Sequence, residues 1–240
     1  MANAILMGLA AGLGTCLGAA AVFLFNFNLR KELFSLFLGL AAGVMLAVIA
    51  CDLLPASLYR GNLSQCLWGI FTGLFFIGVI DFLFAEGSHS GGASGRYLAL
   101  GYLIASGIAI HDLPEGLAIA AGCTEPLALG PLLTLAIGLH NIPEGMATAA
   151  PLWAGGMSAP RILALNVFLS LVTPLGSALG VILIGLSPGF ISFLLAFAGG
   201  AMGYIVLLKL IPESFRHRRS LAWSGIFFGV AFVFFLNLLF

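Results

Sequence analysis

The sequence predicts an all-α integral membrane protein with eight transmembrane helices. Hydrophobic residues make up 61% of the 240-residue chain and charged residues only 8%, with a mean hydropathy of +1.16. A soluble domain has about 25% charged residues. A membrane-spanning helix needs about 20 mostly apolar residues, and the chain divides into eight such stretches joined by short connections. We therefore expect a single polytopic domain over residues 1–240, with the lipid bilayer as its surroundings.

Proline and glycine mark several of the expected spans. In chain order, the spans cover residues 4–26, 34–57, 65–85, 97–122, 129–153, 161–186, 189–213 and 220–240. The first is rich in glycine, which lets a neighbouring helix approach closely. The second and seventh end near Pro55 and Pro212, and Thr173-Pro174 interrupts the sixth, because proline cannot donate a helical hydrogen bond. Residues 86–96 are rich in glycine and serine and predict a flexible loop.

The distribution of lysine and arginine predicts the orientation of the spans. Loops after the odd-numbered spans hold Arg30, Lys31, Arg96, Arg161, Arg216, Arg218 and Arg219. The opposite side holds only Arg60, while Lys209 lies inside span seven. Because basic loops stay cytoplasmic, loop 86–96 should be cytoplasmic and both termini outside, in the plasma membrane or a bacterial inner membrane. The formal net charge is zero, so there is no basic surface for nucleic acid.

The fourth and fifth spans carry two copies of one phrase. Residues 108–121 read Ile-Ala-Ile-His-Asp-Leu-Pro-Glu-Gly-Leu-Ala-Ile-Ala-Ala, and residues 137–150 read Ile-Gly-Leu-His-Asn-Ile-Pro-Glu-Gly-Met-Ala-Thr-Ala-Ala. The copies are 29 residues apart and match at eight of fourteen positions. Ionisable residues inside a membrane are costly and indicate a functional site.

Each copy places its polar residues within roughly 100° of arc on one helix face. These residues are His111, Asp112 and Glu115 in span four and His140, Asn141 and Glu144 in span five. Pro114 and Pro143 each free a backbone carbonyl one turn earlier. Two imidazoles, three carboxylates and an amide oxygen suit zinc, iron or manganese better than calcium or magnesium. The alternative is that these groups only hold two helices together.

A second repeat predicts inverted topology. Residues 41–57 and 198–214 match at six of seventeen positions, including Met45 with Met202 and Pro55 with Pro212. Spans two and seven are separated by five in span number, and spans four and five by one. Because both separations are odd, the two members of each pair cross the membrane in opposite directions. Inverted repeats with a midplane site at proline-broken helices are typical of transporters. We expect a 3+2+3 arrangement, with the metal site between helices four and five.

Other polar residues of the spans have two interpretations each. Asp52 could capture a cation near the external side, and Asp81 and Glu213 could release it toward the cytoplasm. Alternatively, these are interfacial carboxylates that contact headgroups, Lys209 or Arg96. Met45 is a candidate thioether ligand or a packing residue.

The paired phrases and the proline-ended repeats together resemble the ZIP family of divalent-metal transporters, over essentially the whole chain. This resemblance implies uptake into the cytoplasm of zinc above all, and also iron, manganese, cobalt or cadmium. It implies central ligands at His111, Asp112, Glu115, His140, Asn141 and Glu144, with Met45 as an added ligand. Many relatives of this type have an acid where Thr173 stands, which leaves the number of bound metals open.

We therefore expect a transporter, not an enzyme, that works by alternating access and uses the metal ion as its substrate with no cofactor. One alternative is a metal-binding sensor or structural protein without flux. Another is an intramembrane metal-dependent hydrolase, which the His-x-x-x-Glu spacing disfavours because such enzymes use His-Glu-x-x-His. A homodimer is left open.

Overall fold

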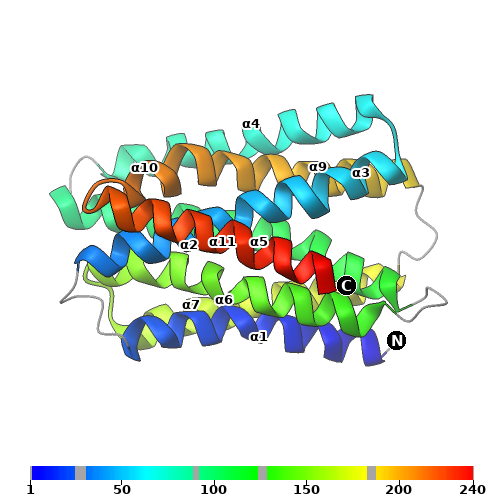
Figure 1. The fold of residues 1–240 in the computed structure, drawn as a ribbon, viewed down its shortest axis with the longest axis horizontal. Helices are drawn as coiled ribbons and strands as arrows, with labels where there is room; N and C mark the ends of the chain where they lie inside the picture. The colour runs from blue at the N-terminus through cyan, green and yellow to red at the C-terminus, as the bar shows by residue number, and fades with distance from the viewer. Residues whose placement is uncertain (1, 25–30, 89–91, 124–128, 183–187, 240) are drawn as a thin grey trace.

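The computed structural model describes residues 2–24, 31–88, 92–123, 129–182 and 188–239, and the regular structure of these residues is helical throughout. The helices are α1 (Ala2–Leu24), α2 (Lys31–Val48), η2 (Ile49–Leu53), α3 (Leu54–Arg60), α4 (Leu63–Ser88), α5 (Gly92–Gly122), α6 (Gly130–Ala154), α7 (Ala159–Ser170), α8 (Val172–Ile182), α9 (Pro188–Ile205), η3 (Val206–Leu210), α10 (Ile211–Ser214) and α11 (Arg219–Leu239). They lie side by side in an elongated bundle (Figure 1). The predicted all-α class is confirmed.

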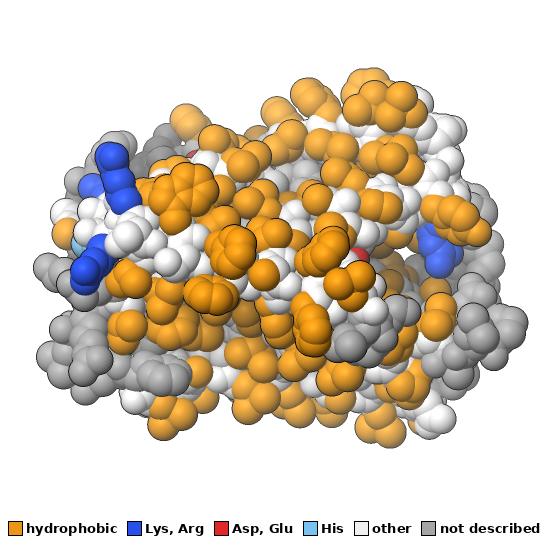
Figure 2. All heavy atoms as spheres, in the orientation of Figure 1, with side chains coloured by type: hydrophobic (Ala, Val, Ile, Leu, Met, Phe, Trp, Pro, Cys, Tyr) orange, Lys and Arg blue, Asp and Glu red, His pale blue; other side chains and the backbone are white. Residues whose placement is uncertain are grey.

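Among the described residues, seven helical segments are long and apolar enough to cross a membrane. The helix α6 is not among them, although it has 25 residues, because the second phrase makes it more polar. Large apolar side chains cover the outside of the bundle, including Leu17, Phe75 and Phe234 at 61%, 65% and 58% exposure. Figure 2 shows this apolar surface across the middle of one face, with lysine and arginine toward its two ends. Such a surface suits lipid, which confirms an integral membrane protein.

The prolines of the second repeat sit directly after short π-helices. In η2 and its counterpart η3, the last hydrogen bond spans five residues: Leu54 N–H donates to the Ile49 carbonyl, and Ile211 N–H donates to the Val206 carbonyl. The widened turn accommodates Pro55 and Pro212, whose rings would otherwise clash with the carbonyl four residues earlier. The helix therefore continues past each proline, to Arg60 and Ser214.

The boundaries differ from the expected ones in two other places. The expected sixth span is two helices, because Leu171 separates α7 from α8 three residues before Pro174. Pro174 leaves the Ser170 carbonyl without its helical donor. The expected loop 86–96 is mostly helical: α4 runs to Ser88, α5 begins at Gly92, and residues 89–91 lie outside the described part.

Glycine contacts divide the helices into two groups. A Cβ on Gly145 of α6 would overlap the carbonyl oxygen of Thr15 in α1, and one on Gly116 of α5 would overlap that of Thr173 in α8. Backbones in such pairs touch directly. These contacts define a first group of α1, α5, α6, α7 and α8. Similar contacts join α2 to α11, through Gly43 and the Ile226 carbonyl, and α4 to α9, through Gly200 and the Ile70 carbonyl. These four helices form the second group, together with η2, α3, η3 and α10.

Candidate metal centre

The two phrases meet where α5 packs against α6. All six predicted polar residues are buried there, with side chains almost completely hidden from solvent. Both helices continue through their internal prolines, Pro114 and Pro143, so each helix keeps its histidine and glutamate one turn apart on one face. The structure therefore brings together the groups that the repeat predicted to share a site.

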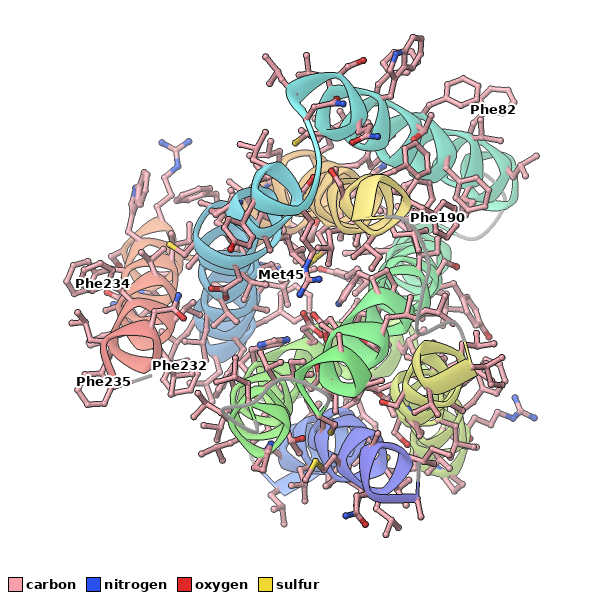
Figure 3. All side chains as sticks on the ribbon, turned by 90° about the vertical axis from the view of Figure 1, so that its right-hand side faces the viewer. Met45, Phe82, Phe190, Phe232, Phe234 and Phe235 are labelled. Atoms are coloured by element: carbon pink, nitrogen blue, oxygen red, sulfur yellow. The ribbon has the colours of Figure 1, made fainter. Side chains whose placement is uncertain are left out.

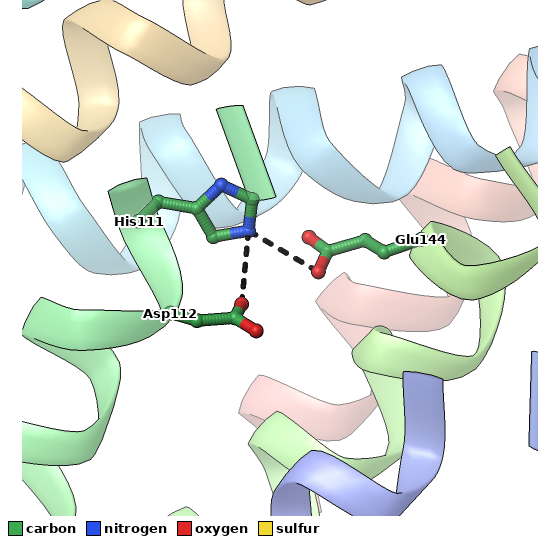
Figure 4. Close-up of side chains that lie close together, drawn as sticks. All are labelled: His111, Asp112 and Glu144. Atoms are coloured by element: carbon green, nitrogen blue, oxygen red, sulfur yellow. Dashed lines mark hydrogen bonds and ion pairs between the residues drawn. The ribbon is translucent and has the colours of Figure 1, made fainter. Parts of the chain in front are cut away.

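The histidine of each helix pairs with the glutamate of the other. The distance from His111 Nε2 to Glu144 Oε2 is 3.2 Å, and that from His140 Nε2 to Glu115 Oε1 is 3.1 Å. The two helices thus exchange equivalent contacts, as expected for two copies of one phrase that face each other. Figure 4 shows the first of these pairs, together with Asp112 at 3.5 Å from the same His111 nitrogen.

A backbone hydrogen bond fixes the orientation of the His111 ring. His111 Nδ1–H donates to the carbonyl of Gly107, one turn earlier, at 2.9 Å. With the proton on Nδ1, a neutral imidazole directs its Nε2 lone pair at the carboxylates of Asp112 and Glu144. A lone pair aimed at carboxylate oxygens needs a cation between them, either a proton or a metal ion. A histidine that binds a metal is usually held by such a hydrogen bond from its other nitrogen.

Several acceptor oxygens of the site have no hydrogen-bond donor among the residues that the structure describes. These atoms are Asp112 Oδ1, Asp112 Oδ2, Glu115 Oε2, Glu144 Oε1 and Asn141 Oδ1, all of them buried. Burying a carboxylate oxygen away from any donor or cation is expensive, so buried charges pair or bind metals. Ligand atoms of His111, Asp112 and Glu144 lie within 4.8 Å of one another, a spacing that one divalent ion can bridge. The donor set fits a zinc-like ion.

Asn141, Met45 and Thr173 lie around this centre in different ways. Asn141 Nδ2 donates to the Ala11 carbonyl of α1 at 3.2 Å, which leaves its oxygen available. Met45 is completely buried on α2 and lies toward the middle of the bundle, whereas Phe82, Phe234 and Phe235 point outward (Figure 3). Thr173 is also buried, and its hydroxyl has no partner among the described residues.

The remaining predicted carboxylates lie away from the centre and have their own partners. Asp52 Oδ1 accepts from Asn237 Nδ2 of α11 at 2.9 Å. Asp81 Oδ2 lies 2.6 Å from Lys209 Nζ and accepts from the Tyr204 hydroxyl at 2.7 Å. Sequence reasoning missed Asn237 and Tyr204, because a lone polar residue in an apolar helix gives no signal until its neighbour is known.

Glu213 lies in an ion-pair cluster at one end of the bundle. Its carboxylate is 3.5 Å from Arg96 Nη2 of α5 and 3.4 Å from Arg216 Nη1. The alternative that Asp81 and Glu213 contact Lys209 and Arg96 therefore agrees with the structure. Their role in releasing an ion stays a prediction, as does that of Thr173.

Known proteins resemble this chain over nearly its full length. The family model described as ZIP Zinc transporter matches residues 85–237. The zinc transporter ZupT of Chlorobium phaeovibrioides is 37% identical over 95% of this chain and 94% of its own length. The zinc transporter ZTP29 of Arabidopsis thaliana is 31% identical over 96% of this chain and 92% of its own length. The zinc transporter GufA of Myxococcus xanthus is 40% identical over 45% of this chain.

Proposed function

The chain belongs to the ZIP family of zinc transporters, and from this premise we propose that it carries divalent metal ions, zinc foremost, through the centre between α5 and α6. The observation that supports this site best is the reciprocal pairing of His111 with Glu144 and His140 with Glu115. Neither helix can complete the ligand set alone. A metal ion bound there would satisfy the buried oxygens that lack donors. The protein is a transporter, not an enzyme, and the ion is its substrate.

The proposed topology has eight spans in a 3+2+3 order, with α6 as the fifth. A polar helix can cross a membrane when protein surrounds it, and α6 packs against α1, α2, α5 and α7. An even number of spans agrees with both chain ends lying in the same half of the bundle (Figure 1). The matching π-helices before Pro55 and Pro212 support an inverted repeat that relates spans one to three to spans six to eight. The basic ends of α5 and α11 would then face the cytoplasm.

Alternating access by relative movement of the two groups is the proposed mechanism. Direct backbone contacts at glycine make each group hard to separate internally. Between the groups the contacts involve side chains, such as that of Ile205 against Gly107. The centre belongs to the first group, and Met45 of the second group lies toward the middle of the bundle. A shift of one group along the other could therefore expose the bound ion to each side in turn without disturbing its ligands.

Metal flux into proteoliposomes that contain the purified protein tests this proposal. We expect saturable uptake of zinc, with cadmium, iron(II) and manganese ranked by the same assay, and no uptake by protein-free liposomes. Tight equilibrium binding without flux would instead support a sensor or structural protein. Metal-dependent release of product from candidate lipids would support a hydrolase. The size of the purified particle in detergent tests whether the protein is a homodimer, which the sequence leaves open.

Zinc uptake should weaken as the pH falls. Metal ligands must be deprotonated, so protons compete with zinc at His111 and His140. The apparent affinity should decline by up to about tenfold per pH unit for each competing proton. The measurement is the Michaelis constant for zinc between pH 5.5 and 8. A His111→Ala, His140→Ala variant that kept the pH profile and affinity of the native protein would contradict the prediction.

A further inference from the structure

The two π-helices carry charged residues of opposite sign at equivalent positions. Asp52 is the fourth residue of η2, three residues before Pro55, and Lys209 is the fourth residue of η3, three residues before Pro212. π-Helical turns occur frequently at functional sites. The two segments are related by the internal repeat, so the difference in charge distinguishes one copy of the repeat from the other.

The partners of these two residues are also equivalent. Asp52 contacts Asn237 of α11, and Lys209 contacts Asp81 of α4. Asn237 lies eighteen residues after Arg219, where α11 begins, and Asp81 lies eighteen residues after Leu63, where α4 begins. The fold therefore builds the same contact twice, once for each copy of the internal repeat. One copy is a carboxylate with an amide, and the other is a carboxylate with an ammonium group.

Asp52 differs from the other carboxylates whose side chains the structure describes. Each of those has a cationic or ionisable partner: Asp81 has Lys209, Glu213 has Arg96 and Arg216, Glu115 has His140, and Asp112 and Glu144 have His111. The described partner of Asp52 is the neutral amide of Asn237, which donates to one carboxylate oxygen only. Asp52 is half-buried, where a charge is screened less than in water. No cationic side chain in the described part of the chain pairs with it.

Asp52 lies on the same span as Met45, which is buried toward the middle of the bundle. It follows Met45 by seven residues, which places it about 10 Å further along the helix axis. A carboxylate at this place attracts cations toward the central ligands.

We propose that Asp52, oriented by Asn237, captures the divalent cation at the end of the pathway opposite Lys209. In the equivalent contact the carboxylate of Asp81 is neutralised by Lys209, so this capture site exists in one copy of the repeat only. This inference rests on the proposed transport function. Asn237 is a positioning residue: its amide holds one carboxylate oxygen and leaves the other to meet the ion.

The test places a lysine beside Asp52, in the position that Lys209 has beside Asp81. In proteoliposomes, Asn237→Lys should place an ammonium beside Asp52, as Lys209 does beside Asp81, and raise the Michaelis constant for zinc about tenfold. Asp52→Asn should raise it about as much and reduce its dependence on ionic strength. In both variants the maximal rate should change little, because the central ligands are intact.

Two controls separate charge from damage to the fold. Asn237→Met has a side chain similar in length to lysine but no charge, and should raise the Michaelis constant less than Asn237→Lys does. Leu238→Lys adds the same charge one residue on, about 100° around the helix, where the native side chain is 70% exposed. It should leave the Michaelis constant unchanged. A native-like constant in both Asp52→Asn and Asn237→Lys, or a loss confined to the maximal rate, would overturn the proposal.

A binding measurement distinguishes failure of this inference from failure of the transport function. In a protein whose centre is disabled by Glu115→Gln and Glu144→Gln, titration calorimetry with Zn²⁺ should detect one weak site that Asp52→Asn removes. If flux is absent from the native protein, the transport function fails, yet this weak site still tests Asp52. Absence of the weak site from the disabled protein would count against the capture role by itself.

Discussion

Replacing Glu115 and Glu144 together with glutamine is expected to abolish zinc uptake, with a loss of at least about 100-fold in initial rate. Glutamine keeps the size of each side chain but removes both carboxylates from the paired contacts with His140 and His111. Its neutral amide cannot balance the charge of a divalent ion in a buried site. Each single variant should already lose most of the activity, because each glutamate forms one of the two histidine pairs of the centre. Initial rates in proteoliposomes check this result.

A matched control for these variants is Thr148→Val on the same helix. Thr148 is buried one turn after Glu144, and its hydroxyl bonds only the Glu144 backbone carbonyl, at 3.1 Å. Valine has nearly the same shape, so uptake should stay within about twofold of the native rate. If the double glutamine variant transported zinc at the native rate, the centre between α5 and α6 would not be the transport site.

Gly145→Ala is expected to destabilise the folded protein by about 3 kcal/mol or more, because the new Cβ would overlap a backbone atom instead of a flexible side chain. The atom is the Thr15 carbonyl oxygen of α1, and the Gly145 backbone lies in the same turn as Glu144. Relief would require α1 and α6 to separate along their length. The apparent melting temperature and the yield of monodisperse protein in detergent measure the effect.

Gly203→Ala is the matched control for that substitution. Gly203 is also a helical glycine, in α9, but a Cβ there meets nothing within 4 Å. Alanine favours helix by about 1 kcal/mol over glycine, so this variant should be as stable as the native protein or slightly more so. Equal stability of the Gly145 and Gly203 variants would contradict the close packing of α1 against α6.

Much of the fold follows from local properties of the sequence. Long apolar stretches predicted where the long helices lie, because a segment that crosses a membrane has few alternatives to a helix. The grouping of His111, Asp112 and Glu115 on one face followed from helical periodicity alone. Seven spans also stand out by hydropathy, whereas α6 does not. The span predicted over residues 129–153 rested on its mostly apolar composition, which the polar residues of the phrase interrupt.

The sequence also predicted, through Pro55 and Pro212, that the second and seventh spans change there, but not how. The structure shows π-helices that let each helix continue to Arg60 and to Ser214. Whether proline ends a helix or is absorbed by a wider turn depends on how neighbouring helices hold the segment, which sequence periodicity does not report.

By itself, then, the sequence determined the class of the protein and its repeats, and it predicted which residues of each phrase share a helix face, since these depend on apolar length and on spacing along a single helix. Only the tertiary structure decided which groups pair across helices. Glu144 with His111, Lys209 with Asp81 and Asn237 with Asp52 are contacts between residues 33, 128 and 185 positions apart. Such contacts are fixed by the packing of whole helices, where glycine sets how closely their backbones approach.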